Sequence, residues 1–137
     1  MHDPTIQRLI DAARAARERA YAPYSKFAVG AALLDEQGRI HAGCNVENAA
    51  YPQGVCAEAG ALSALVLAGG REVHAVLVLA DAPEPVTPCG GCRQKLREFA
   101  RDATPVLVAN SQGQLTRFRL DELLPHSFGP DHLRKSD

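Results

Sequence analysis

The chain has 137 residues, a formal net charge of −1 and 46% hydrophobic residues, values that suit one folded domain with a substantial core. Charged residues make up 23% and the basic ones are dispersed, which argues against a surface that tracks nucleic acid phosphates. The longest apolar stretches, such as AVLVLA, have strand length. We therefore expect no signal peptide, no membrane span and a cytoplasmic protein. With no repeat or linker in view, we expect a single domain over residues 1–137.

The first third of the chain predicts a helix followed by a β-hairpin. Asp3 suits an N-cap and Pro4 the first helical position, and the apolar residues that follow recur at helical spacing. Residues 27–46 predict two strands joined by a turn at residues 36–38.

The remaining elements alternate between helix and strand. An alanine- and leucine-rich helix over residues 56–70 precedes an apolar strand at 73–80 and an amphipathic helix over 89–102. Two strands then flank a turn within residues 105–120, and a short helical turn and a tail follow. This order predicts an α/β fold of three α-β-α layers with a mixed sheet. The last two strands should be antiparallel because so short a connection cannot make a parallel crossover.

Three of the four cysteines stand in two short motifs, Cys56-Ala57-Glu58 and Cys89-Gly90-Gly91-Cys92. A dithiol redox site is one hypothesis, because a helix start lowers a thiol pKa. A structural zinc site is another and requires a fourth ligand, for which the candidates are Cys44, His41 and His74. A catalytic zinc site needs three protein ligands and an open position, and Cys56, Cys89 and Cys92 would supply those three.

Glu58 favours the catalytic hypothesis. A glutamate in the first turn of a helix often just complements the helix dipole. Two residues from a cysteine ligand, however, a carboxylate can take a proton from an activated water and deliver it to a substrate. The combination of Cys-x-Glu with Pro-Cys-x-x-Cys is the pattern of zinc nucleobase deaminases, in which the glutamate is an acid/base and not a ligand.

The sequence resembles cytidine deaminases, specifically the small type with three cysteine ligands. The resemblance runs almost end to end, through YAPYSKFAVGAALL, GCNVENAAY, CAE, PCGGCRQ and ELLPHSFGPDHL. It implies the three-layer cytidine deaminase fold with a mixed five-stranded sheet, zinc bound by the three cysteines, and proton transfer by Glu58. The implied activity is hydrolytic deamination of cytidine and 2'-deoxycytidine to uridine and 2'-deoxyuridine, in pyrimidine salvage.

The resemblance also implies how the nucleoside is held. Asn45 and Glu47 of the NVEN stretch would grip the sugar hydroxyls, a role that amide and carboxylate groups can perform. Phe27 and Ala57 would contact the base. From the residues alone, Asn45 and Glu47 could be a polar loop and Phe27 a core residue at a strand edge.

Two further aromatic residues are implied to act between subunits. Phe128 would reach into a neighbouring subunit's site, and Tyr51 would approach the sugar from another subunit. The resemblance therefore implies a homotetramer with shared sites.

One position departs from the family pattern. The family usually has CAERTA where this chain has CAEAGA, so Ala59 replaces an arginine that would offset the charge of three thiolates. We hypothesise that Arg93, next to Cys92, is the main cation that offsets this charge. It would adjust the properties of the metal without binding it directly.

Other functions remain open. The same chemistry could act on blasticidin S, on a free base or on nucleic acid; the last is disfavoured by the near-neutral charge. A non-catalytic, zinc-stapled module is the alternative from another class. It predicts a fourth protein ligand and no role for Glu58.

Overall fold

The computed structural model describes residues 3–134, and its centre is a five-stranded sheet with strand order β2-β1-β3-β4-β5. Strand β3 is parallel to β4, whereas the pairs β1–β2, β1–β3 and β4–β5 are antiparallel. The sheet is therefore mixed with an antiparallel final pair, which confirms the prediction. In chain order the elements are α1 (Asp3–Arg17), β1 (Gly30–Asp35), β2 (Ile40–Cys44), η1 (Tyr51–Gln53), α2 (Ala57–Leu67), β3 (Val73–Leu79), α3 (Gly90–Arg97), β4 (Pro105–Ala109), β5 (Leu115–Arg119), α4 (Leu120–Leu123) and η2 (Pro130–His132).

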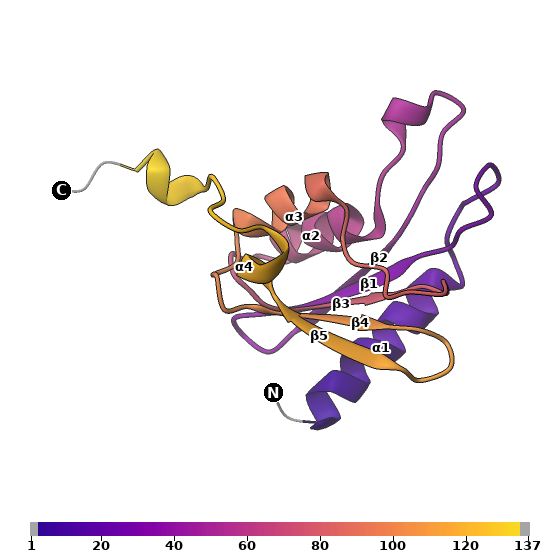
Figure 1. Ribbon diagram of the computed structural model, residues 1–137, viewed down its shortest axis with the longest axis horizontal. Helices are drawn as coiled ribbons and strands as arrows, with labels where there is room; N and C mark the ends of the chain where they lie inside the picture. Colours follow the sequence, from indigo (N-terminus) through magenta and orange to yellow (C-terminus); the bar gives the residue numbers. More distant parts are fainter. Residues whose placement is uncertain (1–2, 135–137) are drawn as a thin grey trace.

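Helices cover both faces of the sheet, so the predicted three layers are confirmed. On one face α1 buries Ile6, Leu9 and Ala13 against Leu77 and Leu79 of β3. On the other face lie α2, α3 and α4 (Figure 1), packed on a separate apolar cluster. Successive β3 side chains point to opposite faces. Because both faces are covered, β3 and β4 read as nearly continuous apolar runs.

The helix starts differ slightly from the predicted ones. Asp3 is the first residue of α1 and not a residue that precedes it. Helices α2 and α3 begin one residue later than predicted, at Ala57 and Gly90, so that Cys56 and Cys89 occupy the N-cap positions. The cysteines consequently stand at helix ends, where backbone N–H groups have no partner within the helix.

None of the helices within residues 3–134 combines the length and apolar character needed to cross a membrane.

A buried carboxylate closes the β1–β2 hairpin. Asp35 is 1% exposed and accepts hydrogen bonds from the backbone N–H groups of Gln37 and Arg39, the Arg39 side chain, and the His41 ring at 2.8 Å. Burial alone would raise the pKa of Asp35, but the hydrogen bonds from His41, Arg39 and Gln37 outweigh it and hold the pKa well below its ordinary value.

We expect Asp35→Asn to lower the free energy of unfolding at pH 7 by about 2 kcal/mol, because the amide cannot accept from Arg39 at both oxygen positions. The folded pKa of Asp35 lies below its unfolded value near 3.8. Its ionised form therefore stabilises the fold above that pH and loses this effect as the pH falls. Urea unfolding should show a constant difference from wild type above about pH 5 that shrinks below about pH 4. Asp11→Asn, at an exposed position on α1, is the control, and an equal effect there would contradict the assignment.

Candidate active site

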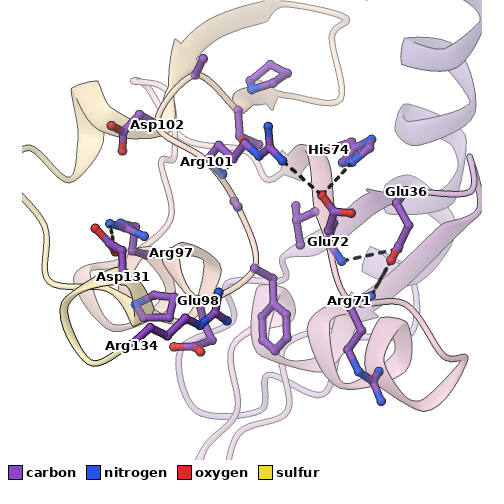
Figure 2. Close-up of a pocket in the computed structure, with 17 residues that line it drawn as sticks. Glu36, Arg71, Glu72, His74, Arg97, Glu98, Arg101, Asp102, Asp131 and Arg134 are labelled. Carbon is purple, nitrogen blue, oxygen red and sulfur yellow. Dashed lines mark hydrogen bonds and ion pairs between the residues drawn. The ribbon is translucent and has the colours of Figure 1, made fainter. Parts of the chain in front are cut away.

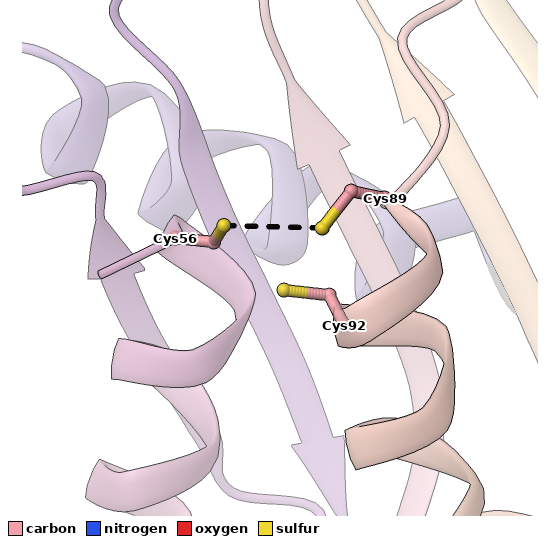
Figure 3. Close-up of side chains that lie close together, drawn as sticks. All are labelled: Cys56, Cys89 and Cys92. Carbon is pink, nitrogen blue, oxygen red and sulfur yellow. Dashed lines mark hydrogen bonds between the residues drawn. The ribbon is translucent and has the colours of Figure 1, made fainter. Parts of the chain in front are cut away.

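The starts of α2 and α3 bring three cysteines together on the sheet face that these helices cover. The sulfur atoms of Cys56, Cys89 and Cys92 all lie within 4.8 Å of one another, and Figure 3 shows them pointing into the space between the two helices. All four cysteines of the chain are free, so the residues predicted as a metal group are together without a disulfide.

The spacing of the sulfurs fits one tetrahedral zinc. The Sγ atoms of Cys56 and Cys89 are 3.9 Å apart. This distance agrees with the separation of about 3.8 Å expected for two sulfurs that each lie about 2.3 Å from one tetrahedral zinc. Within residues 3–134 the metal-binding group consists of these three residues. The candidates for a fourth ligand lie elsewhere: Cys44 ends β2, His41 bonds Asp35, and His74 lies beside Glu72. Three sulfurs without a fourth protein ligand match the donor set of a catalytic site.

A glycine allows α2 to carry its first turn so close to the sheet. A Cβ on Gly43 of β2 would lie 2.4 Å from the backbone N of Ala61 and 2.5 Å from the carbonyl O of Ala57. Any other residue would push α2 off the strand. Ala57, an implied contact of the base, is 1% exposed at this crossing.

The three thiols differ in their electrostatic environment. The backbone N–H of Cys92 donates to the Cys89 sulfur and lowers the pKa of that thiol. Burial raises the pKa of the Cys92 thiol, and the negative charge of Glu58 raises it further. Burial also raises the pKa of the Cys56 thiol, and the charge of the neighbouring Cys89 raises it further. A divalent cation would relieve this mutual repulsion, because it binds the thiolate form of each ligand.

Glu58 lies beside this cluster in the first turn of α2 and is 5% exposed. Burial raises the pKa of its carboxyl group, and the positive charge of Lys95 opposes that rise. A raised pKa brings a carboxyl group closer to the operating pH, which suits a group that must both accept and donate a proton. Lys95 was missed in the sequence, where it reads as one more exposed lysine on an amphipathic helix.

Arg93 has a well-defined place, but its hydrogen bonds go to oxygen atoms. Its guanidinium donates to the carbonyl groups of Pro88 at 2.6 Å and Leu123 at 2.7 Å, and to the hydroxyl of Thr87 at 2.8 Å. These contacts tie the segment before Cys89 to α4. Its role as a compensating cation stays a prediction, and it would act through its charge and through the position of this segment.

The sugar-binding candidates lie in two loops that run side by side. A bridge from Tyr21 to Val46 joins the loop before β1 to the loop after β2, and a bridge from Val46 to Val55 closes the second loop on itself. Both loops project beyond the sheet in Figure 1. A cavity of about 370 Å³ between them is lined by Tyr24, Ser25, Glu47, Asn48, Tyr51 and Gly54. Glu47 and Tyr51 of the same chain line one cavity, whereas the resemblance implies that Tyr51 approaches the sugar from another subunit. Tyr24 and Ser25 were not singled out in the sequence.

Asn45 and Phe27 are hydrogen-bonded to each other, and each is two residues along the chain from a residue that lines this cavity. The Asn45 side chain donates to the carbonyl O of Phe27 at 2.8 Å and accepts from the backbone N–H of Val29 at 2.9 Å. One N–H and one lone pair of the amide remain for a ligand. Phe27 is 37% exposed, so it is not the core residue that the alternative reading suggested.

Phe128 lies apart from the residues above, on the segment that leaves the body after α4 (Figure 1). Its carbonyl O accepts from Gln94 of α3, and its ring stacks on His132. The side chain is 57% exposed and does not line the cavity between the two loops. Its position is thus compatible with an action on another subunit, which stays a prediction.

A second, wider hollow of about 1060 Å³ lies where α3 ends, at the other end of that helix from the cysteines. Figure 2 shows its charged lining, in which basic groups face acidic ones. Arg97 pairs with Asp131 at 2.7 Å, and Glu72 lies 3.9 Å from Arg101 and 3.6 Å from His74. These charges largely neutralise one another, so we place the active site at the cysteines.

The zinc-binding region of cytidine and deoxycytidylate deaminases matches residues 3–108 of the chain, a range that includes all three clustered cysteines. The chain belongs to the cytidine deaminase family. A cytidine deaminase from Sporosarcina psychrophila is 45% identical over 128 residues, which cover 93% of this chain and 94% of that protein. One from Mycobacterium tuberculosis is 41% identical over 114 residues, or 83% of this chain and 82% of that protein.

Solved cytidine deaminase structures share the fold. The structure from Burkholderia pseudomallei superposes with a TM-score of 0.84 at 44% identity and covers 89% of this chain and 98% of that one. The structure from Mycobacterium tuberculosis gives a TM-score of 0.77 at 39% identity and covers 90% and 97%. The predicted family, the predicted fold and zinc as the cofactor are therefore confirmed.

Proposed function

We propose that this cytidine deaminase family member converts cytidine and 2'-deoxycytidine to uridine and 2'-deoxyuridine by hydrolysis. The observation that carries the proposal is a buried glutamate, Glu58, beside three sulfurs that fit zinc and have no fourth protein ligand within the described residues. The relatives named above are cytidine deaminases, which supports the same substrate class here.

The three cysteines and Glu58 would have different roles in the reaction. Cys56, Cys89 and Cys92 would hold zinc, which when bound supplies a water of lowered pKa at the open position. Glu58 takes a proton from that water and delivers it to N3 of the pyrimidine, so that C4 becomes open to attack. Glu58 then carries a second proton from the hydroxyl group that has added to C4 to the departing amino group. A C–O bond forms, the C4–N bond breaks, and ammonia leaves.

The two loops would hold the sugar. Glu47 lines the cavity. The backbone of Phe27 is bonded to the Asn45 amide and, through the Ser25 hydroxyl, to Glu47. Hydrogen bonds from Ser25 and Tyr24 keep the pKa of Glu47 below its ordinary value, so the carboxylate is ionised at neutral pH and accepts only donors such as hydroxyl groups. A free base would leave this polar wall without a partner.

We further propose a homotetramer in which Phe128 and Tyr51 act on neighbouring sites. The support is apolar exposure: Tyr51 is 75% exposed, Phe128 57% and Leu67 90%. Subunit contacts would bury such side chains. Four free cysteines suit a reducing compartment, which supports a cytoplasmic location. We also propose a single domain and a role in pyrimidine salvage with free nucleosides as substrates.

The test is incubation of the zinc-loaded protein with cytidine, 2'-deoxycytidine, cytosine and blasticidin S in parallel. We expect the ultraviolet absorbance to shift from cytidine to uridine, with release of one ammonia for each nucleoside and little reaction of cytosine. Turnover of blasticidin S alone would assign the alternative deaminase, and no turnover of any compound would support the zinc-stapled module.

A further inference from the structure

We propose that Ser25 is a positioning residue that sets the Glu47 carboxylate for one sugar hydroxyl and links it to Phe27. This inference rests on the proposed function, because it assigns Glu47 to the sugar. The two residues are 22 positions apart in the chain but share one cavity wall.

The loop before β1 supplies every hydrogen bond found on the Glu47 carboxylate within the described residues. Oε1 accepts from the backbone N–H groups of Tyr24 at 2.9 Å and Ser25 at 3.1 Å, and Oε2 accepts from the Ser25 hydroxyl. A carboxylate offers about four acceptor sites, so three are occupied by the protein. The site that remains is on Oε2, the oxygen that the serine holds, and it can accept from a single hydroxyl group.

The same serine connects the sugar wall to the aromatic residue. Its hydroxyl oxygen accepts from the backbone N–H of Phe27 at 3.0 Å, while Asn45 holds the carbonyl O of Phe27. The serine has one proton, which goes to Glu47. It cannot also donate to a substrate in this arrangement, so its effect passes through Glu47 and Phe27.

A residue with a strained backbone lies between Ser25 and Phe27, and its own N–H donates to the carbonyl O of Ala22 at 3.0 Å. Lys26 has φ 61°, in the left-handed region that a residue with a side chain rarely adopts. Such a conformation persists where the surroundings fix it. Ser25 anchors the strained residue on one side and Phe27, bonded to the same hydroxyl, anchors it on the other. Loss of the hydroxyl should loosen this turn and leave Oε2 of Glu47 without its protein partner, while the backbone hydrogen bonds to Oε1 remain.

Ser25→Ala tests the proposal through the substrates of zinc-loaded enzyme. We expect kcat/KM for cytidine to fall about tenfold or more, mainly through KM, because a hydrogen bond to a charged group is lost. Glu47 binds either the 2'- or the 3'-hydroxyl, so one of 2'-deoxycytidine and 3'-deoxycytidine lacks the hydroxyl that it binds. That analogue is the one whose turnover does not change in Glu47→Gln. For that analogue the effect of Ser25→Ala should be several-fold smaller, and in a Glu47→Gln background the substitution should change cytidine turnover little.

Controls separate positioning from folding. Ser25→Thr keeps the hydroxyl and should restore most of the lost kcat/KM. Ser111→Ala removes a similar serine-to-carboxylate hydrogen bond, to Asp81 at 2.7 Å, outside the cavity, and should leave all three substrates unaffected. Equal losses on all substrates, or a full Ser25→Ala effect in the Glu47→Gln background, would overturn the proposal. Failure of the wild-type enzyme on cytidine would instead count against the proposed function.

Discussion

Glu58→Gln is expected to reduce cytidine turnover about a thousandfold or more while the protein keeps its zinc. Glutamine matches the shape of the side chain but cannot take up and pass on a proton, and general acid–base groups contribute about 10²- to 10⁴-fold each. Because Glu58 serves two transfers in the proposed reaction, the effect should lie in the upper part of that range. The raised pKa of Glu58, caused by burial, fits a group that is neutral for part of the cycle.

Measuring the zinc content of Glu58→Gln distinguishes a proton-transfer role of Glu58 from a role in binding the metal. The negative charge of Glu58 raises the pKa of the Cys92 thiol, so its removal should favour the thiolate and leave zinc binding unchanged or stronger. Absorbance assays of kcat and measurement of zinc for each chain check both halves. Glu98→Gln, the same change at the exposed residue that caps the C-terminal end of α3, should keep wild-type turnover. Wild-type rates in Glu58→Gln would refute the mechanism, and loss of zinc would make Glu58 part of the metal site.

Local pattern was sufficient for most of the fold. The hairpin turn at residues 36–38, the glycines after α2 and the short link between β4 and β5 each act within a few residues. The starts of α2 and α3 were predicted to within one residue from the same kind of signal. Strand order was not predictable in this way, because β1 pairs with β3 across the whole of α2, and that choice depends on how both apolar faces are buried.

The site shows the same division between local and distant contacts. The cysteines and Glu58 were visible because their chemistry requires a short spacing within each motif. Ser25 was not, since nothing near it in the sequence shows that Glu47 would accept its proton. Arg93 had a visible charge, but its distant partner was not visible: the carbonyl group of Leu123 is brought to it by α4, whereas that of Pro88 lies in the preceding segment. Hydrogen bonds between separate loops depend on the tertiary structure, which a spacing cannot encode.

Cys92→Ala is expected to abolish both zinc retention and turnover. Cys92 is fully buried and its sulfur completes the three-sulfur group. Two remaining thiols cannot supply the three protein ligands of a catalytic zinc site. Because zinc binds the folded chain, its loss should also lower the melting temperature. A chelator should lower the melting temperature of the wild-type protein and leave that of Cys92→Ala almost unchanged.

Cys44→Ala is the matched control and decides between the two zinc hypotheses. Cys44 is also a free cysteine, but it lies at the end of β2 and outside the three-sulfur group. If the site has three protein ligands, this variant keeps one zinc for each chain and wild-type turnover. If zinc were lost from Cys44→Ala as well, four protein ligands would surround the metal. No position would then remain for water, and the sulfur cluster would be a structural staple despite the carboxyl group beside it.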